Sequence, residues 1–210
     1  MHFKKHIATI ALASLLGLCL ADSGVAQAAT DADGDGVPDN AEVLLGTDPQ
    51  VADTDGDGQN DLVDQNPTFM ANPIDMSGTT APLAIKEALV ENNYNYIAKK
   101  DATDHLELLV SNSGNKPLTG LSIYYSIKDA ETGKVEGTFR QLSGLSIPAG
   151  GEARIHFDDG MLSGHFRANP NSIYITSQAA KSISVVLKTD GVAPVNVDIA
   201  KDKGGAEAAD

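Results

Sequence analysis

The sequence predicts a mainly β protein, in which an antiparallel β-sandwich of immunoglobulin-like or fibronectin-like type over residues 83–200 follows a segment of acidic loops. Three observations carry this prediction. Apolar residues alternate along short runs, which puts one face of each run toward a core. Turn signals rich in Gly, Pro, Asn and Asp separate about seven of these runs. Two loops with regularly spaced aspartates precede them, in residues 31–64.

The amino terminus has the pattern of an export signal. Two lysines and a histidine precede an apolar run over residues 7–21, and Ala26-Gln27-Ala28 matches the small-x-small site of a signal peptidase. The apolar run, of about 15 residues, is shorter than the roughly 20 needed to span a bilayer. We therefore expect a signal peptide at residues 1–28 and an exported mature protein that is periplasmic, on the cell surface or secreted. Cleavage also removes Cys19, the only cysteine.

The acidic loops have the spacing of a divalent-cation cage. In a twelve-residue cage, oxygen ligands come from positions 1, 3 and 5, the backbone carbonyl of 7, position 9 through water, and a carboxylate at 12, with glycine at position 6 for the sharp turn. Position 6 is Gly36 in the first loop and Gly58 in the second. The ligand positions are Asp31, Asp33, Asp35, Val37, Asp39 and Glu42 in the first loop, and Asp53, Asp55, Asp57, Gln59, Asp61 and Asp64 in the second.

Calcium is the cation that these ligands predict, because hard oxygen ligands without His or Cys disfavour zinc and copper. The alternative is a solvated acidic linker, which does not require this spacing twice. Residues 29–66 contain eleven acidic residues and no Lys or Arg, and such a density of charge repels itself without bound cations. We expect two or more calcium ions.

The whole run from Asp31 to Asp64, including Gly46-Thr47-Asp48-Pro49 between the loops, resembles the bacterial thrombospondin type 3 repeat. The flanking segments are too short for the helices of ordinary paired EF-hands, and the paired cysteines of the animal repeats are absent. The resemblance implies chain wrapped around calcium ions with little hydrophobic core. It also implies a bridging carboxylate from Asp48, for which a turn residue before proline is the alternative.

The segments on either side of the sandwich read as irregular. Residues 67–82 hold three prolines and no sustained period, which predicts a linker. Residues 201–210 are polar and rich in Gly and Ala, which predicts a disordered tail. We therefore expect the calcium-binding repeats at residues 29–66 and the sandwich to unfold separately, with metal needed by the repeats alone.

The predicted strands of the sandwich are short. Residues 85–97 fit either a first strand or a short helix. The Cys and Trp of antibody domains are absent. Strands are indicated by alternating apolar sets at Leu121, Ile123, Tyr125 and Ile127, at Ile155 and Phe157, at Ile173 and Ile175, at Ile183 and Val185, and at Val195, Val197 and Ile199.

Charge excludes one class of partner. The formal net charge of −14 becomes −15 when the leader loses two lysines and one aspartate, and nucleic-acid binding needs a basic face. The sequence shows no convincing nucleophile with a base, paired carboxylates or open metal site, so we expect no enzyme. His105, His156 and His165 are the mature histidines; we expect His156 to face solvent and His165 to lie in a loop. Asp158 and Asp159 precede Gly160 and predict a turn.

Three functions fit an exported calcium-binding sandwich. The first is an interaction or adhesion module for an unknown envelope or extracellular protein, the second a carbohydrate-binding module of the cell envelope, and the least favoured an unrecognised hydrolase. A glycan module needs exposed aromatic rings, and Trp is absent. Tyr125 has the phase of the apolar residues and is expected in the core. Tyr124 and Tyr174 are the candidates for an exposed pair that binds glycan. The alternative is that they are ordinary tyrosines on the solvated face of a sheet.

Overall fold

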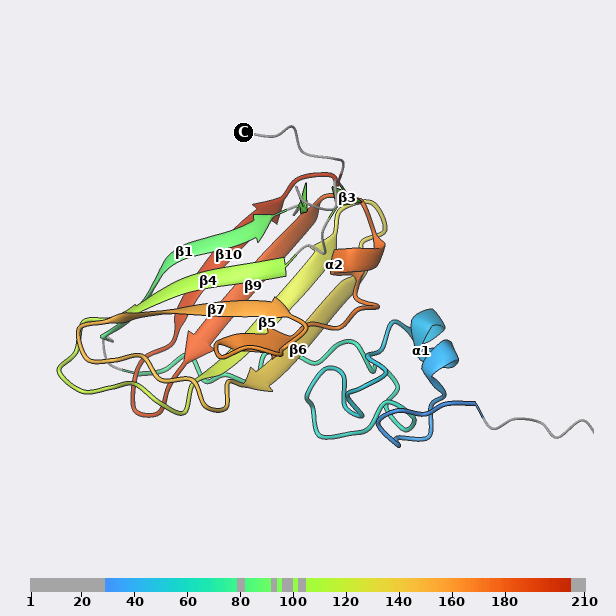
Figure 1. Cartoon of the computed structure of the whole chain (residues 1–210), viewed down its shortest axis with the longest axis horizontal. Coiled ribbons are helices and arrows are strands. Elements are labelled where there is room, and N and C mark those ends of the chain that lie inside the picture. Colours follow the sequence, from blue (N-terminus) through green and yellow to red (C-terminus); the bar gives the residue numbers. More distant parts are fainter. Residues whose placement is uncertain (1–28, 79–81, 92–93, 96–99, 102–104, 205–210) are drawn as a thin grey trace, which may run out of the picture.

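The protein is a sandwich of two four-stranded sheets with the acidic segment docked at one side, as a computed structural model shows (Figure 1). The structure describes residues 29–78, 82–91, 94–95, 100–101 and 105–204. The predicted signal peptide, and residues 205–210 of the predicted tail, lie outside these ranges. No helix in the described ranges is long and apolar enough to cross a membrane.

The mainly β fold class is confirmed. The first sheet has the order β1 (Leu83–Glu91), β4 (His105–Asn112), β7 (Glu152–Asp158) and β8 (His165–Arg167). The second has the order β10 (Val195–Lys201), β9 (Lys181–Lys188), β5 (Ser122–Asp129) and β6 (Val135–Gln141). A separate pair joins β2 (Tyr94–Asn95) to β3 (Lys100–Asp101). The pairs of these sheets are antiparallel except β7 with β8, which is parallel. Two short helices are α1 (Asp39–Leu45) and α2 (Ile173–Thr176).

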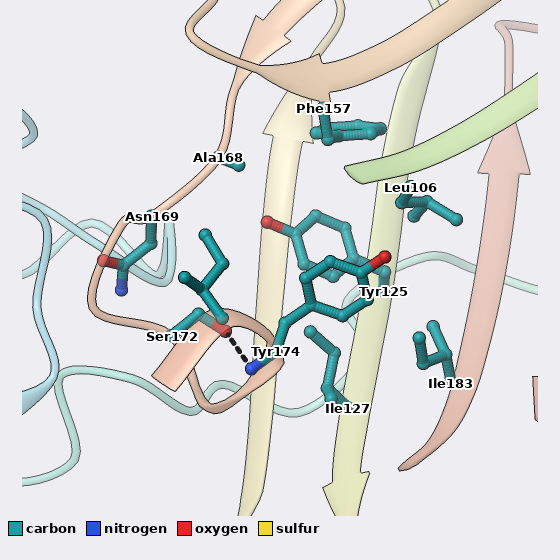
Figure 2. Close-up of a pocket in the computed structure, with 10 residues that line it drawn as sticks. Leu106, Tyr125, Ile127, Phe157, Ala168, Asn169, Ser172, Tyr174 and Ile183 are labelled. Carbon is teal, nitrogen blue, oxygen red and sulfur yellow. Dashed lines mark hydrogen bonds between the residues drawn. The ribbon is translucent and has the colours of Figure 1, made fainter. Parts of the chain in front are cut away.

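The strand predicted at Ile173 and Ile175 is wrong, because this segment forms helix α2. The Ser172 hydroxyl accepts a hydrogen bond from the backbone N–H of Tyr174 and thereby caps the helix (Figure 2). The carboxylate of Glu136 accepts hydrogen bonds from the Ser172 hydroxyl at 2.5 Å and from the Ile173 N–H at 3.1 Å. Capping by a distant carboxylate thus overrides the alternating apolar pattern.

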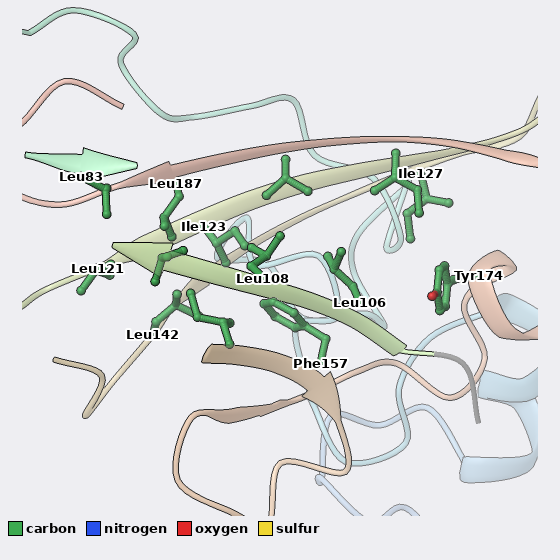
Figure 3. Packing of buried hydrophobic residues seen from close by; sticks show 14 of the residues in the cluster. Leu83, Leu106, Leu108, Leu121, Ile123, Ile127, Leu142, Phe157, Tyr174 and Leu187 are labelled. Atoms are coloured by element: carbon green, nitrogen blue, oxygen red, sulfur yellow. The ribbon is translucent and has the colours of Figure 1, made fainter. Parts of the chain in front are cut away.

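The core lies between the sheets, where the alternating residues meet (Figure 3). Ile123 from β5 and Ile155 from β7 are fully buried, as their predicted phase requires. Residues 83–91 form a strand rather than a helix, with a register shift between Ile85 and Glu87. The other fully buried side chains of the cluster include Leu108, Val110, Leu121, Ile147, Val185 and Leu187.

The segment predicted as a linker packs along the outer face of the second sheet. Phe69 forms a parallel bridge with Gly137 of β6, and the Tyr124 hydroxyl donates to the Met70 carbonyl at 3.0 Å. Ile74 packs with Tyr124 and Val186 in a small second cluster. Tyr124 therefore points away from the main core, as its phase predicts, but residues 68–74 cover it.

We expect Gly137→Ala to displace this covering segment. A Cβ atom at Gly137 would lie 2.6 Å from both the Met70 carbonyl oxygen and the Tyr124 hydroxyl, so one of them must move. Overpacking of this kind costs about 1–3 kcal/mol of the free energy of unfolding. Chemical denaturation measures the loss, and Val135→Ala, at an exposed position of the same strand, is the control. Equal stability of the two variants would contradict the prediction.

Candidate functional site

The two acidic loops fold with the same hydrogen-bond pattern. In each, the position 1 carboxylate, Asp31 or Asp53, accepts backbone N–H groups from positions 4 and 6 at 2.8–3.1 Å. Position 6 has a positive φ in both, 100° at Gly36 and 95° at Gly58, as the sharp turn requires. Each position 9 carboxylate, Asp39 or Asp61, accepts the N–H of position 2 at 2.8–2.9 Å. The two loops, which have similar sequences, therefore also have similar backbone structures.

Three of the four aspartates at positions 3 and 5 leave one carboxylate oxygen for another partner. Asp33 and Asp35 use Oδ1 to accept the N–H two residues on, at 3.2 and 2.6 Å. Asp55 and Asp57 do the same at 3.0 and 2.8 Å. Asp57 differs in that its Oδ2 also accepts the side-chain amide of Gln59, on the exposed rim of the second loop. The Oδ1 atoms thus stabilise the backbone turn, and the Oδ2 atoms of Asp33, Asp35 and Asp55 have no hydrogen-bond partner among the described residues.

Each loop gathers ligand atoms closely enough to hold a metal ion. The ligand oxygens of Asp31, Asp33 and Asp35 all lie within 4.8 Å of one another, and so do those of Asp53, Asp55 and Asp57. Within the described ranges, these are the groups of three or more His, Cys, Asp or Glu that meet this distance. Two acidic clusters that could hold a metal ion therefore lie where the spacing predicts them.

Several oxygens of these clusters are buried without a hydrogen-bond donor. They accept no hydrogen bond from any residue in the described part of the chain, although Glu42, Asp55 and Asp35 are 0%, 1% and 6% exposed. A buried carboxylate oxygen without a partner costs several kcal/mol or more, and a bound cation removes that cost. The atoms are Asp33 Oδ2, Asp35 Oδ2, Glu42 Oε2 and Asp55 Oδ2, together with Asn60 Oδ1.

The same crowding raises the affinity of these groups for protons. Burial, with repulsion from Asp33, raises the pKa of Glu42 to about 7. Burial, with repulsion from Asp57, raises the pKa of Asp55 to about 7. Burial also raises the pKa of Asp33 and of Asp61. A cation beside these oxygens would favour their ionised forms instead.

The two position 12 residues are placed differently. Glu42 is buried in helix α1, and its Oε1 accepts the Thr47 hydroxyl at 3.3 Å. Helix α1 ends at Gly46, whose φ of 85° permits the left-handed cap. Asp64 is half-buried, and its Oδ1 accepts the Asn66 N–H at 2.8 Å. The position 7 residues also differ, since the Val37 side chain is buried and Gln59 is exposed.

The repeats have no apolar core of their own in the structure, as the resemblance implies. Apart from the buried Val37, their large apolar side chains are mostly exposed, on α1 and at the end of the second loop. Hydrogen bonds within the segment and to the sandwich therefore hold its fold in the structure. The exposed residues are Val43, Leu44, Leu45, Leu62 and Val63.

Asp48 lies in neither of the two acidic clusters and has a partner in the sandwich. It is fully buried and holds Arg167 of β8 in a bidentate ion pair, with Nε–Oδ2 at 2.7 Å and Nη2–Oδ1 at 2.6 Å. Repulsion between the loops instead involves Asp61, whose raised pKa comes from burial and from repulsion by Asp35 and Asp53, and Glu42, which Asp61 repels. The planar guanidinium of Arg167 donates to both carboxylate oxygens of Asp48 at once, which makes this a strong pair.

Further hydrogen bonds dock the repeats on the sandwich beside β6 and the segment before α2 (Figure 1). The side-chain amides of Asn169 and Asn171 each donate at 2.7 Å to backbone carbonyls of the repeats, those of Gly46 and Thr47. The Arg140 guanidinium donates to the Thr54 carbonyl at 3.2 Å, and the Phe139 N–H donates to the Asp55 carbonyl at 2.8 Å. The second loop is thus hydrogen-bonded directly to strand β6.

The structure brings His156 and His165 together on neighbouring strands β7 and β8. Their rings stack with centroids 4.4 Å apart and 8° between planes. The loop predicted for His165 is wrong, because this residue lies in strand β8. His156 lies on the face opposite the buried Ile155 and Phe157, as predicted, but it is only 20% exposed and stacks on His165. In-plane lone pairs of parallel rings do not converge on one ion, which disfavours a chelate. The side chain of His105 lies outside the described part of the structure.

The acids beside the histidines have structural partners. Asp158 Oδ2 lies 2.5 Å from His165 Nδ1, and Glu107 Oε2 lies 3.5 Å from His156 Nδ1. Asp158 Oδ1 also accepts the Gly160 N–H at 3.0 Å, and Gly160 has a φ of 72°. The turn predicted at Asp158 and Asp159 is confirmed.

The exposed tyrosine pair expected for glycan binding is not formed. Tyr124 is 6% and Tyr174 7% exposed, the first beneath residues 68–74 and the second in α2 against the core. Tyr174 lines a small pocket at one end of the core (Figure 2). The lining carries no charged side chain; it consists of Leu106, Tyr125, Ile127, Phe157, Ala168, Asn169, Ser172, Tyr174, Ile175 and Ile183.

Sequence comparison finds neither a matching family model nor a matching curated protein. Among solved structures, the chain is similar to a Parabacteroides merdae β-glucuronidase (TM-score 0.32, 10% identity), a Pseudomonas fluorescens alkylpurine DNA glycosylase AlkC bound to DNA (0.30, 16%) and a β-glucosidase from intestinal bacteria (0.30, 12%). Each match covers 57% of this chain and only 13%, 30% and 16% of those chains, respectively. Similarity this low decides neither fold nor function.

Proposed function

We propose that this is an exported calcium-binding protein whose metal-stapled repeats are docked on a β-sandwich interaction or adhesion module. The observation that carries the proposal is the set of buried carboxylate oxygens without donors, in two loops of matching hydrogen-bond pattern. We assign no catalytic role to the chain. Export is supported by the amino-terminal pattern alone.

Calcium fits the donor set better than other common cations. The ligands are carboxylates and the backbone carbonyls of Val37 and Gln59, and the loops are long enough for six or more oxygens. Magnesium demands a smaller, near-octahedral shell and usually keeps several waters, whereas four of these carboxylate oxygens are buried without a donor. The thiolates and imidazoles that select zinc or copper are absent from both loops.

The role that follows for calcium is structural. The repeats carry a dense negative charge and no apolar core, so cations offset the repulsion that would otherwise open both loops. Hydrogen bonds to Gly46, Thr47, Thr54 and Asp55 reach the sandwich only when the loops keep their shape. The sandwich would present the surface that meets an envelope or extracellular protein.

We expect the mature protein, residues 29–210, to bind at least two calcium ions. Dissociation constants on the order of 0.1–1 mM are typical of extracellular modules, and the high ligand charge favours tighter values. Asp31→Ala and Asp53→Ala remove the position 1 carboxylate of one loop each and should each abolish or strongly weaken one of the two binding steps. Isothermal titration calorimetry measures this, with His156→Ala as the control. Absence of both calcium heat and any calcium-dependent spectral change in the wild type would reject the proposal.

A further inference from the structure

Asn60 reaches from the second loop into the first. It occupies position 8 of the second loop, which supplies no ligand in a twelve-residue cage. Its Nδ2 donates to the backbone carbonyl of Asp35 in the first loop, at 3.3 Å. Its Oδ1 is buried and accepts no hydrogen bond from the residues that the structure describes. The amide is therefore held against the first loop with its acceptor still unused.

The first loop, which this amide contacts through the Asp35 carbonyl, has unpartnered acceptors of its own. Oδ2 of Asp33, Oδ2 of Asp35 and Oε2 of Glu42 share the property of Asn60 Oδ1, since all are buried acceptors without a donor. These atoms cannot satisfy one another, because ionised carboxylate oxygens and an amide oxygen only accept hydrogen bonds. A cation in the first loop would satisfy the oxygens that ligate it, and amide oxygens are ordinary calcium ligands.

The backbone of the second loop holds Asn60 in this position. The Asn60 carbonyl accepts the N–H groups of Val63 and Asp64 at 3.1 Å, and the next residue, Asp61, donates its N–H to Ala52 at 2.9 Å. The Asp61 carboxylate is fixed in turn by the N–H and hydroxyl of Thr54. The placement of Asn60 thus depends on the closed form of the second loop.

We propose that Asn60 Oδ1 is a ligand of the first cation, the one held by Asp31, Asp33, Asp35 and Glu42. The inference rests on the proposed calcium function. Because the second loop positions Asn60, filling that loop prepares the first site, and the two ions bind with positive cooperativity. The coupling is reciprocal, so that filling the first site also favours the second by the same factor.

Two substitutions at Asn60 separate a ligand from a structural amide. Asn60→Ala removes the oxygen and should weaken the first site by about tenfold or more, since loss of even outer-shell partners costs 10–100-fold. Asn60→Asp keeps the oxygen and removes the N–H donor, so it should bind at least as tightly as the wild type. Calcium titrations followed by NMR at the amides of Gly36 and Gly58 report each loop separately.

Asn40 provides the matched controls, because it lies exposed on α1 in the same acidic segment. Asn40→Ala should leave both affinities unchanged, and Asn40→Asp measures the gain due to one added charge alone. Unchanged calcium affinity in Asn60→Ala would overturn the proposal. So would a loss of affinity in Asn60→Asp as large as in Asn60→Ala, because it would show that the amide acts only through its hydrogen bond with Asp35. A wild type that binds no calcium would reject the proposed function instead.

Discussion

Arg167→Ala is expected to release the calcium-binding repeats from the sandwich. The substitution leaves the Asp48 carboxylate fully buried without its cation, and loss of one partner of a buried pair costs about 3–5 kcal/mol. We expect a lower free energy of unfolding and faster proteolysis within residues 29–66 in saturating calcium. Chemical denaturation and limited proteolysis with mass spectrometry measure the two effects.

The chain offers a matched control for this ion pair. Arg154 pairs with Glu107 and Glu87 on the exposed face of the first sheet, and half of its side chain is exposed. Surface pairs contribute about 0–1 kcal/mol, so Arg154→Ala should have a small effect. The double variant Asp48→Ala with Arg167→Ala should lose less than the sum of the two single variants. An additive double variant would show that the pair does not couple the repeats to the sandwich.

The sequence predicts the local features of the site well. The aspartates at positions 1, 3 and 5 of both loops gather into clusters that could hold a metal ion, and position 6 makes the sharp turn, since these contacts span a few residues of a repeated motif. Strand phases are predicted for the same reason. Ile123 and Ile155 face the core, and Tyr124 faces outward, because alternation along a strand is a local property.

Features that depend on distant partners could not be predicted from local patterns. Arg167 meets Asp48 across 119 residues, and no spacing rule indicates that pair. Glu136 caps the segment of Ile173 from β6, which turns an alternating run into a helix. Residues 68–74 bury Tyr124 on the face that its phase makes outward. Each case shows tertiary contacts deciding between conformations that the sequence leaves open.

Asn60 belongs to the same class of residue. Its position within the second loop has no ligand role, and its significance comes from contact with Asp35, 25 residues earlier. The sequence gives one indication of this contact, the short distance along the chain between the two acidic loops. In the structure, Asn60 of the second loop lies against Asp35 of the first. Such neighbours share ligands more readily than isolated loops do, because the intervening chain is only ten residues long, from 43 to 52.

Calcium removal is expected to open the repeats while the sandwich stays folded. Without cations, the buried oxygens of Glu42, Asp35 and Asp55 have no donor, and eleven acids in residues 29–66 repel one another. Proteolysis in chelator should therefore cut within residues 29–66. Because residues 68–74 pack on the second sheet, the resistant fragment should begin near residue 67, before the first strand at Leu83.

Mass spectrometry of the fragments decides between this outcome and two others. A fragment that begins near Leu83 would show that residues 68–74 leave the sheet together with the repeats. Cleavage inside the sandwich would show that calcium supports the whole chain, because docking through Arg167, Asn169 and Asn171 then contributes to the stability of the first sheet. The double variant Asp31→Ala with Asp53→Ala, digested in excess calcium, should reproduce the chelator pattern. Protection of that variant would assign the effect of chelation to a cation held elsewhere than in the two loops.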